Sequence, residues 1–340
     1  MLTQMTDVIP GALAFACFVL MIFFPQGVLE GARNGLGLWA NILTPSLLPF
    51  FIISEILIRA GWLDRFGRWL SPLMRPLFRL PGDAGFVLLM GYTTGFPMGA
   101  VLTRRLYEEG RLTRKEAAIL VAFTNNASPL FILAALASGM LREPALGGWI
   151  ALCHYGANLL YGVCLTRFSR GAPGASADTY RSAPSSAAPS RNRFSAGLVI
   201  TESIRAGVQN TIQLGGYIVF FASVIQLLNQ THIFAALAAC LNPVLPASLA
   251  GRGISQGILS GLLEMTSGLS GITAASLPRH TQMKLVLGLL GFSGVSIQAQ
   301  VSGMLSDSGI PLTPYFLGRL FQPLLSIALF QILSPLIPLS

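Results

Sequence analysis

The sequence predicts an all-α polytopic membrane protein with two inverted repeats, each holding a re-entrant helical hairpin, and about seven spanning helices. Its 340 residues are 53% hydrophobic and only 10% charged, long stretches lack any charge, and features recur at an offset of 170 residues. Soluble domains carry about 25% charged residues. So few charges cannot cover a surface in water, so we expect lipid to cover it.

Charge-free stretches give the predicted spans. They occupy 8–29, 34–54, 84–103, 117–141, 144–166, 206–251, 285–306 and 320–340. A helix needs about 20 mainly apolar residues to cross the hydrocarbon core, and it satisfies its own backbone hydrogen bonds. The predicted spanning helices are 8–28, 36–58, 116–141, 146–166, 206–228, 284–306 and 313–337.

An internal repeat relates the two halves of the chain. Each copy shows an apolar helix, a short segment containing proline, a Gly-rich apolar segment and a long apolar helix, followed by one more span. Matched pairs at the 170-residue offset include Phe50 with Phe220, Pro76 with Pro246 and Gly91 with Gly261. We therefore expect an N-terminal helix (1–32), a first repeat (33–167), a flexible cytoplasmic linker rich in Ser, Ala and Pro (168–195) and a second repeat (196–340).

The Gly-rich segments 84–103 and 254–276 contain GYTTGFPMGA and GLLEMTSGLSG. Such clusters break a helix, which leaves two interpretations: a kinked full span or a re-entrant hairpin. Broken backbone survives at membrane depth only where it is buried or lines a cavity. If both segments are hairpins, residues 59–115 and 167–205 lie on one side and hold 16 of the 22 Lys and Arg residues. The positive-inside rule favours hairpins and places that side in the cytoplasm.

Three crossings then separate helix 36–58 from helix 206–228, so the two copies are inverted. Inverted repeats with discontinuous helices are typical of secondary transporters, whose substrate site lies near the midplane. The sequence therefore predicts a substrate site between the two hairpins, with lipid around it.

Glu264, in the predicted break of the second hairpin, is the sharpest candidate. An ionisable group at that depth is costly and is a functional candidate by default. It either binds a coupling cation or proton, or it caps the N-terminus of a half-helix. Thr266 and Ser267 follow it in the same motif.

In the first hairpin, the candidates are Thr93, Thr94 and Gly95. Hydroxyl groups and exposed half-helix N-termini suit an anionic substrate, whereas small residues also serve only to permit tight helix packing. Both long helices after the hairpins carry polar interruptions, FTNNASP and FSGVSIQAQ, which either line a substrate path or join helices by hydrogen bonds. Their candidate residues are Asn125, Asn126, Ser128, Ser293, Ser296 and Gln298.

Other classes of protein are disfavoured. The net charge of +9 sits in short loops, where it determines topology, and no nucleic-acid recognition motif accompanies it. The four cysteines and three histidines form no metal pattern. No phosphate-binding loop or catalytic motif occurs, so we expect neither an enzyme nor a cofactor.

The motifs GYTTGFPMGA, FTNNASP, GLLEMTSG and FSGVSIQAQ resemble those of the sporulation integral membrane protein YlbJ family. That family carries nucleoside-recognition (Gate) domains and is distantly similar to concentrative nucleoside transporters. The resemblance covers about 33–335 without the linker. It implies transport of dipicolinic acid, a small planar dianion, across the outer forespore membrane.

The resemblance leaves alternatives. The chain could instead carry nucleosides or nucleobases, or act as a membrane scaffold in sporulation. Nucleoside transporters usually place more acidic groups at the site than the single Glu264, which puts their sodium coupling in doubt here. The coupling ion, H+ or Na+, and the existence of a homo-oligomer stay open at this stage.

Overall fold

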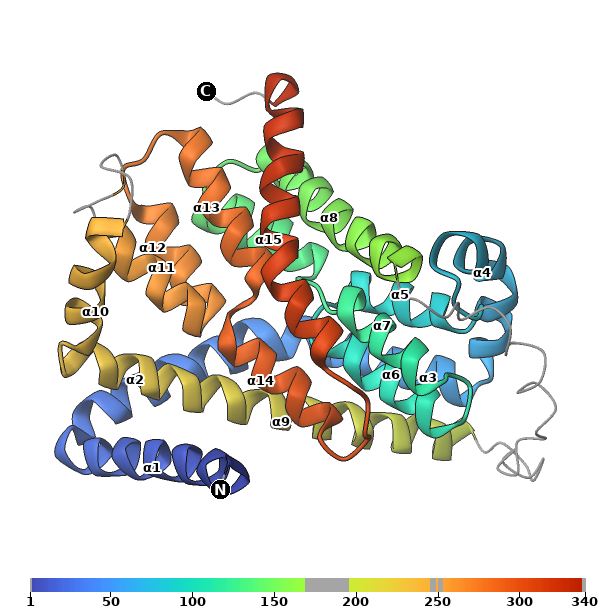
Figure 1. Ribbon diagram of the computed structural model, residues 1–340. Helices are drawn as coiled ribbons and strands as arrows, with labels where there is room; N and C mark the ends of the chain where they lie inside the picture. The colour runs from blue at the N-terminus through green and yellow to red at the C-terminus, as the bar shows by residue number, and fades with distance from the viewer. Residues whose placement is uncertain (1, 169–195, 245–248, 250–252, 338–340) are drawn as a thin grey trace.

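The computed structural model describes residues 2–168, 196–244, 249 and 253–337 (Figure 1). The predicted linker therefore lies, except for its first residue, outside the described residues. All regular elements among the described residues are helical, as expected. Those of the first half are α1 (Leu2–Phe23), α2 (Pro25–Leu38), η1 (Trp39–Leu43), α3 (Thr44–Arg59), α4 (Trp62–Phe78), α5 (Ala84–Thr94), α6 (Met98–Glu108), α7 (Arg114–Thr124), η2 (Phe131–Met140) and α8 (Leu146–Phe168).

The second half begins with the long helix α9, which runs along the lower side of the molecule in Figure 1. Its elements are α9 (Ala196–Gln230), α10 (Ile233–Leu241), η4 (Asn242–Val244), α11 (Ile254–Leu263), α12 (Met265–Ala274), α13 (Arg279–Phe292), α14 (Gly294–Leu305), α15 (Thr313–Leu333) and η5 (Ser334–Leu336). Two buried apolar clusters form the core, one centred on α4–α7 and one on η2, α8 and α11–α13.

The first predicted span is not a single straight helix. Residues 8–28 are divided between α1 and α2, which meet at an angle of 106°. Pro25 is the first residue of α2, and a proline lacks the N–H needed to continue the preceding helix. The expectation of one continuous span at 8–28 was therefore wrong. By length and composition, three described helices could cross a membrane, Gly197–Gln230, Arg279–Leu305 and Thr313–Leu336, and the bent pair could form a fourth.

The helix formed by α2, η1 and α3 packs antiparallel against α9. A Cβ at Gly27 would touch the side chain of Gln230, and one at Gly207 would lie 2.8 Å from Ile52. Between these ends, the indole Nε1 of Trp39 donates to the carbonyl of Thr211 at 2.8 Å. Rising residue numbers on one partner thus meet falling numbers on the other. This register confirms the inverted relation between the first helices of the two repeats.

Both Gly-rich segments are helical hairpins. In the second, a Cβ at Gly268 would lie 2.1 Å from the Cα of Gly261, so α11 and α12 lie against each other without intervening side chains. In the first, both arms pack on the end of α7, since a Cβ at Gly91 or Gly99 would lie 2.2 or 2.6 Å from the carbonyl oxygen of Thr124. The chain therefore turns back at Gly95–Pro97 and at Glu264, as the re-entrant interpretation requires.

The long helices predicted at 116–141 and 284–306 are interrupted rather than continuous. The first stops at Thr124, and helical structure resumes only near Pro129, which leaves residues 125–128 without regular secondary structure and Asn125 extended. Proline disfavours helical backbone in the residue before it. The second is divided at Ser293, which adopts a left-handed φ of 70°. Four breaks thus occur, two in each repeat, at matching positions.

Polar contacts gather at two opposite ends of the molecule. At one end, Arg105 pairs with Glu55 at 2.8 Å and Arg167 donates to the carbonyl of Pro76 at 3.1 Å. At the other end, Arg279 pairs with Glu143 at 2.9 Å. The first end holds the segments that the charge bias places in the cytoplasm.

Candidate functional site

A cavity of about 80 Å³ lies where the helix breaks of the two repeats meet. Its walls also include α2 and η1 on one side and α9 on another. The polar side chains that line it are Thr94, Ser128, Glu264, Thr266, Ser296 and Gln300. The apolar side chains include Phe96, Phe131, Leu214, Ile218 and Ile297. The structure thus brings five of the predicted candidates together from both repeats.

Glu264 caps the second half-helix of its hairpin. Its backbone is extended (φ −139°, ψ 115°), and its carboxylate accepts hydrogen bonds from the N–H groups of Thr266 at 2.8 Å and Ser267 at 2.7 Å. The Ser267 hydroxyl also donates to it at 2.7 Å. An acidic cap neutralises the partial positive charge of a helix N-terminus. In this conformation Glu264 therefore acts as the N-terminal cap of α12, and it also lines the cavity.

Asn125 joins two half-helices of the first repeat. Its Oδ1 accepts from the N–H of Ala100 at 3.0 Å, near the N-terminus of α6. Its Nδ2 donates to the carbonyl of Val121 at 2.9 Å, in the last turn of α7. The side chain is fully buried. A buried amide with both ends paired fixes the angle between the hairpin and the broken helix.

Three further candidates bond to helix ends beside the cavity. The side-chain amide of Asn126 donates to the carbonyl of Phe123, and the side-chain amide of Gln298 donates to the carbonyl of Phe292. The Ser293 hydroxyl donates to the carbonyl of Leu290. All three distances are 3.1 Å. These contacts replace main-chain bonds lost at the breaks.

The remaining candidates of the first hairpin divide into two groups. The Thr94 hydroxyl is buried and donates to the carbonyl of Met90 at 2.5 Å, leaving its lone pairs toward the cavity that it lines. Thr93 is exposed and bonds to the Leu89 carbonyl at 2.9 Å. Gly95 has a φ of 86° and packs on Ser128, where a Cβ would lie 2.7 Å from the backbone nitrogen. Glycine is needed there because only it adopts this conformation at such close approach.

Arg319 is a functional candidate that the analysis of motifs missed. This side chain on α15 is completely buried, donates to the Ser293 hydroxyl at 2.9 Å and to Asn158 Oδ1 at 3.4 Å, and lies 5.1 Å from the ring centre of Tyr315. No salt bridge joins it to a carboxylate of the described residues. Its signal in the sequence was a lone charge inside an apolar span, which is costly and is retained for function by default.

The C-terminal ends of α7 and α13 lie against α15 close to Arg319. The neighbouring Gln322 donates from Nε2 to the carbonyl of Ala122 at 2.9 Å, in the last turn of α7. Ser293, which accepts from Arg319, ends α13. Helix C-termini carry partial negative charge. Arg319 therefore sits where α15 crosses the ends of both broken helices, directly behind the breaks.

Comparison with known proteins places this architecture in a family. A family model described as Gate, nucleoside recognition, matches residues 41–141. The sporulation integral membrane protein YlbJ of Bacillus subtilis (strain 168) is 35% identical over 312 residues, which cover 89% of this chain and 76% of that protein. The chain belongs to the YlbJ family.

Solved structures show the same fold for this YlbJ-family protein. A variant of CNTnw in an outward-facing state superposes with a TM-score of 0.55 at 14% identity, covering 100% of this chain and 86% of that chain. A second CNTnw variant, in an intermediate state, gives the same TM-score and identity with 87% of its chain covered. At this identity the likeness concerns the fold, which is that of concentrative nucleoside transporters.

Proposed function

We propose that this YlbJ-family protein transports a small anionic metabolite, and that its substrate is dipicolinic acid, moved across the outer forespore membrane during sporulation. The observation that carries the proposal is the cavity in which the breaks of two inverted repeats meet. Discontinuous helices around a midplane site are the arrangement that secondary transporters use. Membership of a family of sporulation membrane proteins supports the cellular setting.

The cavity offers groups that match a planar dicarboxylate. Hydroxyls of Ser128 and Thr266 and the amide of Gln300 can donate to carboxylate oxygens, and the rings of Phe96 and Phe131 can flank an aromatic ring. Its volume of about 80 Å³ is below the 300–1,000 Å³ common for small-molecule sites. Substrate binding therefore requires the broken segments to separate from the conformation seen here.

Glu264 would couple the anion to a cation. A carboxylate beside the cavity repels a dianion in surroundings of low dielectric. A proton or a bound cation on Glu264 removes that repulsion, so substrate and cation bind together more readily than either alone. We infer that transport is coupled to H+ or Na+ through this residue.

The test is uptake of radiolabelled dipicolinate into proteoliposomes, with and without sodium and at two pH values. We expect saturable uptake that unlabelled dipicolinate inhibits and uridine does not. Uptake of neither compound would contradict transport and favour the scaffold function.

The Glu264→Gln variant tests the coupling. Since the amide keeps an acceptor oxygen but cannot ionise, we expect uptake to lose its dependence on pH or sodium. Glu202→Gln, a matched change on α9, should leave that dependence intact. An unchanged dependence in Glu264→Gln would remove the coupling role.

A nucleoside or nucleobase carrier is the second candidate. One observation favours it: the charged side chain that lines the cavity is Glu264, and no Lys or Arg lines it among the described residues. Such a lining suits a neutral ligand with hydroxyl donors. Uridine uptake that dipicolinate does not inhibit would support this alternative over the first.

A further inference from the structure

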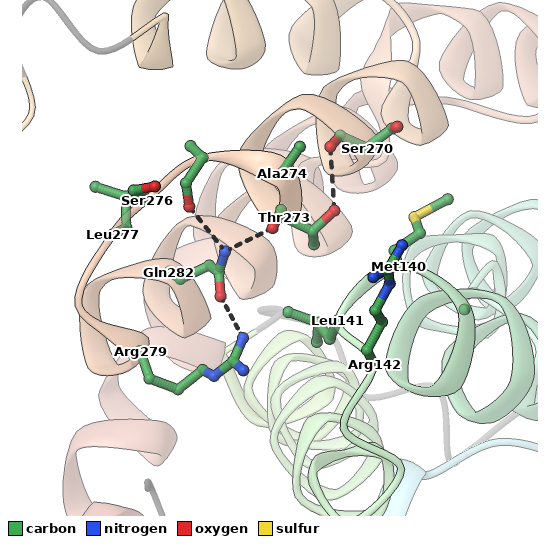
Figure 2. A pocket seen from close by; sticks show the side chains of 12 residues that line it. Met140, Leu141, Arg142, Ser270, Thr273, Ala274, Ser276, Leu277, Arg279 and Gln282 are labelled. Atoms are coloured by element: carbon green, nitrogen blue, oxygen red, sulfur yellow. Dashed lines mark hydrogen bonds between the residues drawn. The ribbon is translucent and has the colours of Figure 1, made fainter.

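A second, larger cavity of about 700 Å³, drawn in Figure 2, is lined by Arg279. It therefore opens near the end of the molecule opposite the predicted cytoplasmic side. It lies between the end of η2, the end of α12 and the beginning of α13. Its volume is in the range of small-molecule sites. Its polar lining includes Arg142, Ser270, Thr273, Arg279 and Gln282.

The positive charge of this cavity comes from Arg142. Arg279 is neutralised, because it pairs with Glu143 at 2.9 Å and donates to Gln282 Oε1 at 2.6 Å. Arg142 forms no salt bridge with any residue that the structure describes, and its side chain is exposed. Figure 2 shows it extending on the opposite side of the cavity from Arg279. The cavity therefore carries one uncompensated cation.

The backbone of Arg142 also adopts an uncommon conformation. Its φ is 56°, a left-handed conformation found directly after the end of η2. Glycine or asparagine normally occupies such a position after a helix, because most other residues are strained in this conformation.

One face of α12 connects the two cavities. Thr266 lines the inner cavity, whereas Ser270 and Thr273 line the outer one. Steps of four and three residues place the three hydroxyls on the same face of a helix. The facing element η2 also reaches from one cavity to the other, since Phe131 lines the inner cavity and Met140 lines the outer cavity. A row of hydroxyl groups thus leads from one cavity toward the other.

We propose that the outer cavity is an anion-binding vestibule, in which Arg142 holds a carboxylate with help from the Ser270 hydroxyl at the mouth of the substrate pathway. A guanidinium binds a planar carboxylate through two parallel hydrogen bonds. The vestibule is distinct from the inner cavity, and only the identity of its natural anion, a small dicarboxylate, rests on the proposed function.

The charge of the vestibule can be measured without transport. In a variant whose four native cysteines are replaced by alanine, the Ser270→Cys thiol is modified by methanethiosulfonate reagents of opposite charge. We expect the anionic reagent to react faster than the cationic one, relative to the same thiol in a small peptide. Adding Arg142→Gln should lower that ratio by about tenfold, as expected for loss of a unit charge at close range, and Arg142→Lys should largely keep it.

A matched control is Arg33→Gln, which removes an exposed charge from α2, away from the cavity. It should leave the ratio unchanged. If Ser270→Cys disturbs folding, the same measurement at Ala274→Cys, another residue lining the cavity, replaces it. A ratio that Arg142→Gln does not alter would overturn the vestibule.

Protection by dipicolinate separates this inference from the proposed function. We expect dipicolinate to slow modification when Arg142 is present and not in Arg142→Gln. A charge effect of Arg142 without protection by dipicolinate would support the vestibule and count against dipicolinate as the substrate.

Discussion

Asn125 and Gln298 show how single side chains stabilise unwound segments inside this protein. Each donates to a main-chain carbonyl at the end of a broken helix. Without such partners, buried main-chain groups at the breaks would lose water and gain nothing in return. The polar residues near the breaks therefore serve the backbone first, and only some of them face the cavity.

Replacing Asn125 by alanine should destabilise the protein. The change removes the side chain that joins α7 to α6 at this point: the Val121 carbonyl loses its donor, while the Ala100 N–H keeps its bond to the Pro97 carbonyl at 2.9 Å. A buried group left unpaired costs about 1–3 kcal/mol. We expect a clear fall in the unfolding temperature in detergent, measured by intrinsic fluorescence. Asn34→Ala, at an exposed position on α2, should have little effect. Equal unfolding temperatures for the two variants would contradict the bridging role.

Replacing Arg319 by methionine should separate stability from function. No carboxylate loses its partner, and apolar residues often substitute for buried charges at little cost or with a gain. We expect an unfolding temperature within a few degrees of the parent and a strong loss of anion uptake, with partial uptake in Arg319→Lys. A large fall in unfolding temperature with normal uptake per folded molecule would show a purely structural role.

At the level of elements, glycines decide whether the hairpins close. The arms of the second hairpin touch through Gly257, Gly261 and Gly268, and the arms of the first pack on Thr124 through Gly91 and Gly99. Each contact leaves no room for a side chain. Tight backbone packing through small residues is a common source of helix association in lipid.

Gly268→Ala should therefore open the second hairpin. Its Cβ would lie 2.1 Å from the Cα of Gly261, which is backbone and cannot rotate away. We expect a lower yield of monodisperse protein on size-exclusion chromatography and loss of uptake. Gly271→Ala is the control, because its Cβ would lie 3.4 Å from the nearest atom outside its own helix. Similar behaviour of both variants would argue against close contact of the arms.

At the level of the whole molecule, the antiparallel pairing of α2 and α3 with α9 brings the two repeats together in opposite directions. The inner cavity is bordered by both members of this pairing, since Leu38 and Leu214 line it together with residues of both hairpins. The inner cavity therefore belongs to neither repeat alone.

Cysteine cross-linking tests that pairing. In a background without native cysteines, Gly27→Cys with Gln230→Cys should form a disulfide on oxidation, because a Cβ at Gly27 already touches the Gln230 side chain. Gly27→Cys with Thr201→Cys, at the other end of α9, should not. Non-reducing peptide mass spectrometry detects the linked peptides. A disulfide in the second pair alone would indicate parallel repeats.

Sequence patterns by themselves determined the helical membrane class, the inverted repeat and the breaks inside the two hairpins, because hydropathy, charge bias and glycine or proline act over a few neighbouring residues. The same patterns missed the 106° bend at Pro25 and treated the helices at 116–141 and 284–306 as continuous. Proline and polar residues can kink a helix or end it, and packing selects between these outcomes.

Only the tertiary structure decided which polar side chains face a cavity. Asn125 and Ser128 are three residues apart, yet the Asn125 side chain forms hydrogen bonds to helix ends whereas Ser128 lines the cavity. Likewise, Glu143 follows Arg142 directly in the chain but pairs with Arg279, more than a hundred residues away. The free energy of a buried polar group depends on the partners that folding brings to it, and those partners are distant in sequence.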